Sequence, residues 1–221
     1  MALILSLETT TTNCSVALGK DGNLLAIKEN NSKNYSHAEQ LHLYIKEVLA
    51  EANYTLDALD AIAVSKGPGS YTGLRIGVSA AKGLCFSLDI PLIAVDTLQA
   101  LSTQVDFEHY NYTIPMLDAR RMEVYTAVFD KEGNCVSPTV AKLLDDTSYR
   151  EYAGKVVFIG NAVTKFKPVC THPGATFIAS LPTAKSMIPL AETKHKKGNT
   201  EDVAYFEPYY LKDFIAKKSK K

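Results

Sequence analysis

The sequence predicts an α/β protein built from two consecutive units that share one order of elements. Short apolar runs, typical of buried strands, alternate with segments whose apolar residues recur at helical spacing. An Asp-Gly turn joins two of the runs near the start, and a similar hairpin turn recurs in the second half. With 221 residues, of which 46% are hydrophobic and 22% charged, the chain has the composition of an ordinary globular protein of one or two domains.

The first half reads as βββαβαβα. Residues 3–7 form an apolar strand, and residues 13–19 and 24–29 flank the Asp21-Gly22 turn. A helix follows, with Ser36 and Glu39 at the spacing of a capping box and apolar residues that recur to position 52. Residues 61–65 form the next strand, residues 72–88 a helix and residues 91–95 a strand. Asp96 then caps a third helix that ends near residue 104.

The second half repeats this order with weaker patterns. We expect strands at 113–118, 123–130 and 135–143, a short helix at 146–152 and a strand at 156–159. A helical turn at 161–167, a strand at 176–179 and a helix at 184–195 complete the unit. The polar stretch 105–111 separates residues 1–105 from residues 106–221. A duplicated βββαβαβα unit is the architecture of the ribonuclease-H-like, actin-like (ASKHA) fold.

Charge and cysteine content exclude several classes of protein. The 24 basic residues balance the 24 acidic ones, which argues against a strongly basic nucleic-acid binder. No apolar run is long enough to span a bilayer, and no basic region precedes the first apolar run, so we expect a cytoplasmic protein. The four scattered cysteines (Cys14, Cys85, Cys135, Cys170) are expected to be reduced and mostly buried. From Lys194 onward the chain is basic. This end is either a solvated tail or a weak contact with RNA or an acidic partner.

The helix at 72–88 is apolar on nearly every side, which predicts that it is buried on more than one side. Because a sheet covers only one face, we expect the other to meet a helix of this chain or of another. One hypothesis is a subunit interface built from this helix and the helix before it; in the other, the two helices pack together on one sheet. The interface residues would be His37, Leu41, Tyr44, Val48, Leu74, Val78, Ala81 and Cys85. Val78→Glu is then expected to abolish association while the monomer stays folded.

Three turns could contact an anion. The glycine-rich turn from Gly67 to Gly73 leads from a strand into a helix, although it matches neither the P-loop nor the GxGxxG spacing. The threonine turn after Glu8 and the turn at Asp118 to Arg121 lack glycine. Each has an alternative: close packing, turn hydrogen bonds or solvated charges. The residues that would contact an anion or nucleotide are Thr9, Thr10, Gly67, Gly69, Ser70, Asp118 and Arg120.

No catalytic or metal-binding set is detectable. His37 and His42 lie five residues apart on one helix, about 140° around its axis, so they cannot share a metal ion. The metalloprotease motif HExxH and the hydrolase motif GxSxG are both absent. The sequence therefore predicts no catalytic residue, metal or cofactor.

Several motifs resemble those of the TsaB (YeaZ) family. The opening strand with Glu8-Thr9-Thr10, the turn Gly67-Pro68-Gly69-Ser70-Tyr71-Thr72-Gly73, and Asp118-Ala119-Arg120-Arg121 carry the resemblance over roughly the first 125 residues, with a weaker match at Tyr210-Leu211-Lys212. Three positions depart from the family pattern: Glu8 replaces an Asp, Tyr71 a Phe and Lys212 an Arg.

The resemblance implies a bacterial, actin-like subunit without catalytic activity of its own. Such proteins are required to form threonylcarbamoyladenosine in tRNAs that read codons beginning with A. They pair with a metal-binding catalytic paralogue, TsaD, and a small ATPase, TsaE, joins the complex. The same two N-terminal helices would mediate both self-pairing and pairing with the paralogue, and tRNA would be contacted only indirectly or weakly.

Two other functions remain open from the residues. An autonomous actin-like ATPase or small-molecule kinase would need glycine-bearing phosphate loops in both halves, and residues 8–12 and 118–121 lack them. A tRNA-binding protein in its own right would depend on the basic C-terminal end.

Overall fold

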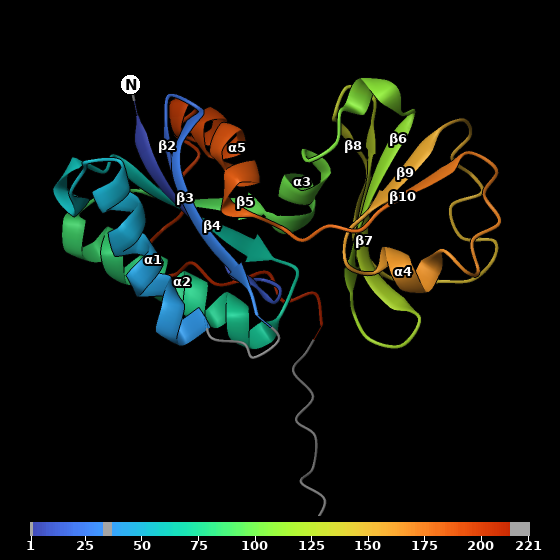
Figure 1. Ribbon diagram of the computed structural model, residues 1–221, viewed down its shortest axis with the longest axis horizontal. Coiled ribbons are helices and arrows are strands. Elements are labelled where there is room, and N and C mark those ends of the chain that lie inside the picture. Colours follow the sequence, from blue (N-terminus) through green and yellow to red (C-terminus); the bar gives the residue numbers. More distant parts are fainter. Residues whose placement is uncertain (1, 33–36, 213–221) are drawn as a thin grey trace, which may run out of the picture.

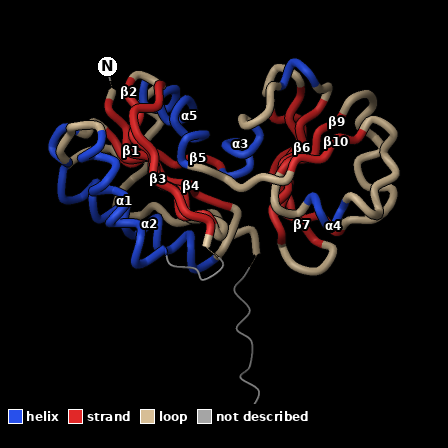
Figure 2. Tube along the Cα trace, viewed as in Figure 1, coloured by secondary structure: helices blue, strands red, loops and turns tan. Residues whose placement is uncertain are grey.

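Two five-stranded sheets lie next to each other in the computed structural model, which describes residues 2–32 and 37–212 (Figure 1, Figure 2). The first sheet has the order β3-β2-β1-β4-β5. Its strands are β1 (Leu3–Glu8), β2 (Asn13–Lys20), β3 (Asn23–Asn31), β4 (Ala61–Gly67) and β5 (Leu92–Asp96). Strands β1 to β3 are antiparallel, and β4 and β5 run parallel to β1.

Helices cover both faces of the first sheet because its strands are apolar on both sides. Leu3, Leu5 and Leu7 of β1 belong to the core beneath α1 (His37–Glu51) and α2 (Tyr71–Leu88). Ile4, on the opposite face, belongs to the core beneath α5 (Ala184–Lys196). The predicted hairpin is confirmed, with Asp21 and Gly22 at φ of 52° and 79°. The predicted serine cap of α1 at Ser36 lies outside the described residues.

The second sheet has the order β10-β9-β6-β7-β8. Its strands are β6 (Tyr112–Asp118), β7 (Glu123–Asp130), β8 (Cys135–Leu143), β9 (Val156–Ile159) and β10 (Ala175–Ile178). The short helix α4 (Val163–Phe166) packs on one face, and α3 (Thr97–Ser102) packs on the other. Single 3₁₀ turns occur at Leu56–Ala58 and Phe107–His109. As predicted, Asp96 caps α3 by accepting from the backbone N–H groups of Leu98 and Gln99. The predicted α/β class is confirmed, with one five-stranded sheet from each half of the chain.

The prediction of a helix at residues 146–152 is wrong. This stretch forms a series of turns, and Tyr149 adopts a left-handed φ of 68°, which is incompatible with a helix. The Tyr149 side chain is fully buried, and its hydroxyl donates to Thr126 Oγ1 at 3.1 Å. Burial of the ring therefore outweighs the local preference for a helix.

The predicted boundary at residues 105 and 106 separates the two sheets, but residues 106–221 do not form one unit. Met187 and Ala191 of α5 are fully buried with Ala2 and Ile4 of the first sheet. The last helix thus returns to the first half, as Figure 1 shows. Helix α3 lies between the two sheets, where Leu98 and Leu101 pack against Leu117 of β6.

The segment after α5 is held in place along the first half. The backbone N–H of Glu201 donates to the Leu92 carbonyl of β5, and that of Tyr209 to the Lys66 carbonyl. Lys82 of α2 donates to the carbonyls of Ala204 and Phe206 at 3.1 and 2.9 Å. The solvated-tail interpretation is therefore wrong for residues 199–212. Residues 213–221 lie outside the described part of the chain.

Candidate functional site

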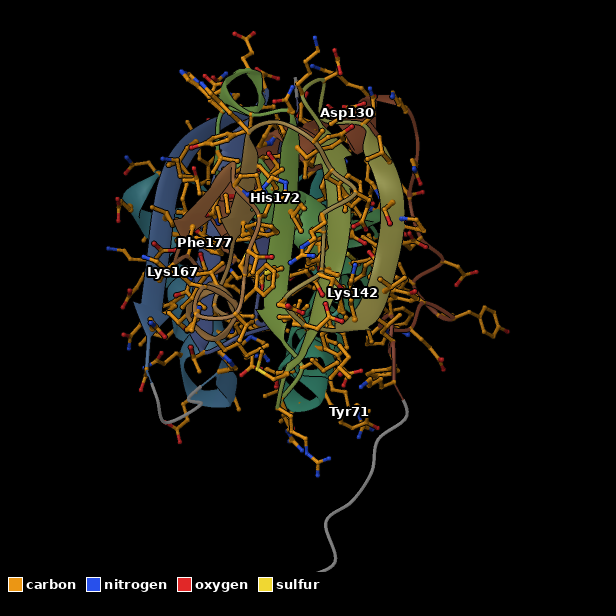
Figure 3. The ribbon with its side chains drawn as sticks, turned by 90° about the vertical axis from the view of Figure 1, so that its right-hand side faces the viewer. Tyr71, Asp130, Lys142, Lys167, His172 and Phe177 are labelled. Atoms are coloured by element: carbon orange, nitrogen blue, oxygen red, sulfur yellow. The ribbon has the colours of Figure 1, made fainter. Side chains whose placement is uncertain are left out.

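A cleft of about 850 Å³ lies where the two halves meet at one end of the molecule. It is lined mainly by four segments: residues 10–12, 68–72, 117–121 and 209–212. Figure 3 shows Tyr71, one of the lining residues, at the lower end of the molecule, and Asp130, the last residue of β7, at the opposite end. Of the residues predicted to contact an anion, the lining includes Thr10, Gly69, Ser70, Asp118 and Arg120. Anion binding by this set stays a prediction.

The glycine-rich turn brings α2 against the threonine turn that follows β1. A Cβ atom at Gly73 would lie 2.0 Å from the Thr9 carbonyl oxygen, and one at Gly69 would lie 2.5 Å from Thr10 Cβ. One turn further along α2, a Cβ at Gly77 would lie 2.3 Å from Thr9 Oγ1. Ser70 caps the helix by accepting from the Gly73 N–H at 3.3 Å. The motif glycines therefore permit close packing, and the chain's own threonines fill the space that they leave.

Two of the residues predicted to contact an anion are buried away from the cleft. Thr9 is fully buried, and its hydroxyl donates to the Gly73 carbonyl at 2.7 Å. Gly67, at a φ of 112°, is covered by the carbonyl of Tyr209, and its N–H donates to Thr97 Oγ1. Neither residue is exposed to a ligand, so the prediction is wrong for these two positions.

Glu8 is fully buried and does not line the cleft. Its Oε1 atom accepts hydrogen bonds from the backbone N–H and the hydroxyl of Thr10, at 2.6 and 2.5 Å. Burial raises the pKa of the Glu8 carboxyl above its ordinary value, and the hydrogen bonds from Thr10 oppose this shift. The carboxyl thus fixes the threonine turn instead of facing a ligand.

The β6–β7 turn places Arg120 and Arg121 on the other side of the cleft. Lys165 of α4 holds this turn, donating to Asp118 Oδ1 at 2.5 Å and to the carbonyls of Arg121 and Glu123 at 2.8 and 2.6 Å. Within the described part of the chain, neither guanidinium has a hydrogen bond or an ion pair. The acids at this end are neutralised, since Asp118 pairs with Lys165 and Glu123 with Lys212.

Sequence reasoning missed the contribution of the C-terminal segment to the cleft. The rings of Tyr71 and Tyr210 lie 4.8 Å apart between centroids, and Arg75 lies over Tyr71 at 5.4 Å. Tyr209 and Lys212 also line the cleft. Two sequence signals were present: the weak family match at Tyr210-Leu211-Lys212, and the Tyr209-Tyr210 pair, because two adjacent aromatic residues are unusual in a solvated tail.

The residues predicted for a subunit interface lie within the core of this chain. Except for Tyr44, which is half-buried, all of them are 5% exposed or less. They are His37, Leu41, Val48, Leu74, Val78, Ala81 and Cys85. These residues lie on the inner faces of α1 and α2, which pack toward the sheet. They are therefore not exposed to a partner. Val78→Glu would bury a charge in this core and unfold it, so it cannot test association.

Other predicted features can be placed in the structure. Cys14 and Cys85 are buried, Cys170 is half-buried and Cys135 is exposed, and all four are free thiols. In residues 2–32 and 37–212, no three side chains of His, Cys, Asp or Glu gather closely enough to hold a metal ion. None of the described helices is both long and apolar enough to cross a membrane.

Comparison with known proteins places the chain in a family. Residues 29–220 match the family model described as TsaD, tRNA N6-adenosine threonylcarbamoyltransferase. The tRNA threonylcarbamoyladenosine biosynthesis protein TsaB of Escherichia coli K12 is 30% identical over 224 residues, which cover 96% of each chain. The tRNA N6-adenosine threonylcarbamoyltransferase of Bacillus thuringiensis Al Hakam is 38% identical over 108 residues, which cover 42% of this chain and 32% of that one.

The solved structure of YeaZ from Pseudomonas aeruginosa has the same fold. It superposes with a TM-score of 0.85 and 29% identity, covering 96% of this chain and all of that one. The match extends over both sheets, so the actin-like, ribonuclease-H-like architecture applies to the whole described chain. The chain belongs to the TsaB (YeaZ) family.

Proposed function

We propose that this protein is a non-catalytic subunit in the formation of threonylcarbamoyladenosine in tRNAs that read codons beginning with A. It would pair with a TsaD-like catalytic paralogue and a TsaE-like ATPase, and with itself when alone. The names of its relatives support the pathway. Its match to both TsaB and the transferase supports pairing, because two chains with related surfaces can join about a pseudo-twofold axis.

The filled glycine spaces support a non-catalytic role most directly. An actin-like phosphotransferase would need backbone N–H groups that reach a phosphate without obstruction. Here, Gly69 and Gly73 are packed against the backbone of Thr9 and Thr10, and Glu8 is buried beneath the same turn. Thr9 and Thr10 thus occupy the space in which an autonomous kinase would hold the nucleotide phosphate.

The outer face of α1 and α2 is the surface that a partner would cover. Leu43 on α1 is 51% exposed and Phe86 on α2 is 83% exposed. Three further apolar residues of α2, Ile76, Ala80 and Leu84, are only partly buried. Phe86 also borders an open groove whose other wall is formed by residues 202–204. Large apolar side chains exposed on the outer sides of packed helices are typical of protein interfaces.

Light scattering after size exclusion tests this proposal. We expect a homodimer for the chain alone and a heterodimer when it is mixed with its TsaD-like paralogue. Leu43→Glu and Phe86→Glu are expected to weaken both associations at least tenfold, because they place a charge in an apolar contact. Val136→Glu, at a position 49% exposed on β8, is the matched control and should have no effect.

Two outcomes would overturn the proposal. One is that no heterodimer forms even with ATP and the ATPase present. The other is that the chain alone hydrolyses ATP or phosphorylates a small molecule, which would favour the autonomous enzyme.

A further inference from the structure

Arg120 and Arg121 occupy a backbone conformation that does not suit arginine. Their φ angles are 72° and 48°, so both residues at the tip of the β6–β7 turn are left-handed. Such turns favour Asn and Gly, because a larger side chain strains the left-handed backbone. Both side chains are exposed. Strained residues whose side chains make no hydrogen bond or ion pair within the described part of the chain point to a role in binding more than in stability.

The turn is fixed in one orientation, which prepares the two guanidinium groups for a ligand. Lys165 uses three hydrogen bonds to hold the turn, and the Asn161 side chain accepts from the Asp118 N–H at 2.8 Å. The ion pairs of Asp118 and Glu123 leave the two arginines as the uncompensated charges on this wall of the cleft. Two adjacent guanidinium groups of this kind suit a ligand with several anionic groups in a row, such as a polyphosphate backbone.

Aromatic rings line the rest of the same cleft. The Tyr71–Tyr210 pair lines the same cleft as the arginine turn, and Tyr125 and Tyr209 are also part of the lining. A basic groove with aromatic rings is typical of single-stranded nucleic-acid binding, in which phosphates meet cations and bases stack on rings.

These features favour RNA over the other anions that arginine binds. A nucleotide phosphate alone would use the glycine turn, whose spaces the threonines fill. An acidic protein segment would pair with the arginines but would not need the tyrosine rings.

We propose that this cleft binds single-stranded RNA, with Arg120 and Arg121 on the phosphates and Tyr71 and Tyr210 stacking on bases. This inference rests on the proposed function only for its source of RNA, the tRNA of the modification reaction. The contact would be weak and salt-dependent, as expected for a chain with no net charge.

Fluorescence anisotropy with a labelled, unstructured twelve-nucleotide RNA tests the proposal on the full chain. We expect micromolar affinity at low salt. In Arg120→Asn/Arg121→Gly, affinity should fall at least fivefold, and the slope of log K against log salt should drop by about 1.4, because two phosphate contacts are lost. The thermal midpoint should not fall, since Asn and Gly suit this turn. Tyr71→Ala should weaken binding more than Tyr71→Phe, which keeps the ring.

A matched control removes two positive charges elsewhere. In Lys131→Asn/Lys155→Asn, the first substitution lies beside Asp130, at the end of the molecule opposite Tyr71 (Figure 3). This variant should bind RNA as the unmodified chain does.

The proposal fails if the control loses as much affinity as the arginine variant, if an RNA duplex binds better than the single strand, or if no RNA binds at low salt. Binding of an oligoglutamate peptide in place of RNA would identify a protein-docking site instead, and binding of ATP alone a nucleotide site. Failure of the chain to join its paralogue, with RNA binding intact, would refute the proposed function and leave this site standing.

Discussion

The contact between α2 and the threonine turn can be tested by one substitution, Gly73→Ala. The added Cβ would lie 2.0 Å from the Thr9 carbonyl oxygen, and contacts under 3.0 Å are essentially never observed, so helix and turn must separate by at least 1.0 Å. Overpacking of this kind costs about 1–3 kcal/mol. The hydrogen bond from Thr9 Oγ1 to the Gly73 carbonyl, worth about 1 kcal/mol, would be strained as well. Alanine's better helix propensity returns about 1 kcal/mol. We expect a net loss of about 2 kcal/mol in the free energy of unfolding.

Gly83→Ala provides the matched control in the same helix. No atom lies within 4 Å of the added Cβ, so only helix propensity acts and the chain should gain about 0.8 kcal/mol. The change in the free energy of unfolding of both variants would be measured by urea unfolding, followed by far-ultraviolet circular dichroism because the chain has no tryptophan. If Gly73→Ala were as stable as Gly83→Ala, α2 would not rest on the threonine turn as described, and the glycine turn would have room for a phosphate.

Three further predictions concern side chains buried near the cleft or in the second core. Because burial raises the pKa of Glu8 in the folded state, the folded chain binds more protons than the unfolded chain, and stability falls as pH rises above the ordinary value of 4.5. Glu8→Gln removes that loss, so its stability relative to the unmodified chain should increase with pH in urea unfolding; a difference that does not change with pH would contradict this. Ser70→Ala removes the N-cap of α2 and should cost about 1 kcal/mol by the same assay, whereas no loss would show that the cap is made by another group. Tyr149→Phe leaves Thr126 without its donor and should lower the thermal midpoint, by an amount equivalent to about 1 kcal/mol; an unchanged midpoint would mean that water replaces the bond.

Local rules were sufficient wherever one short segment determined its own structure. The Asp21-Gly22 turn and the Asp96 cap were predictable because each depends on a few neighbouring residues. Tyr149 was not predictable, because its left-handed backbone is maintained by burial of the ring in a core assembled from distant strands. The meeting of the β6–β7 turn with the threonine turn in one cleft was not predicted, because it depends on how the two sheets pack together and no short segment encodes that packing.

The apolar surface of α2 shows why the predicted interface was placed on the wrong residues. The pattern correctly indicated burial on more than one side, but it could not say what covers each side. Val78 packs in the core beneath the helix, whereas the side of α2 that carries Lys82 and Phe86 lies against residues 202–204 of the C-terminal segment. That segment has no regular secondary structure and therefore no periodicity to reveal it. Lys82 fixes it by donating to two of its carbonyls.

The same segment then continues into the cleft, where Tyr210 meets Tyr71 at the N-terminal end of α2. Helix α2 therefore carries part of the proposed partner surface, contacts the C-terminal segment and lines the cleft. Phe86 lies on its outer face and borders the groove beside residues 202–204, so a partner that covers Phe86 would also contact this segment. A subunit docked on the helices would thereby contact the C-terminal segment, which also forms one wall of the cleft. Association at one surface and binding at the other should be energetically coupled, and by reciprocity RNA in the cleft should change the affinity for the partner by the same factor.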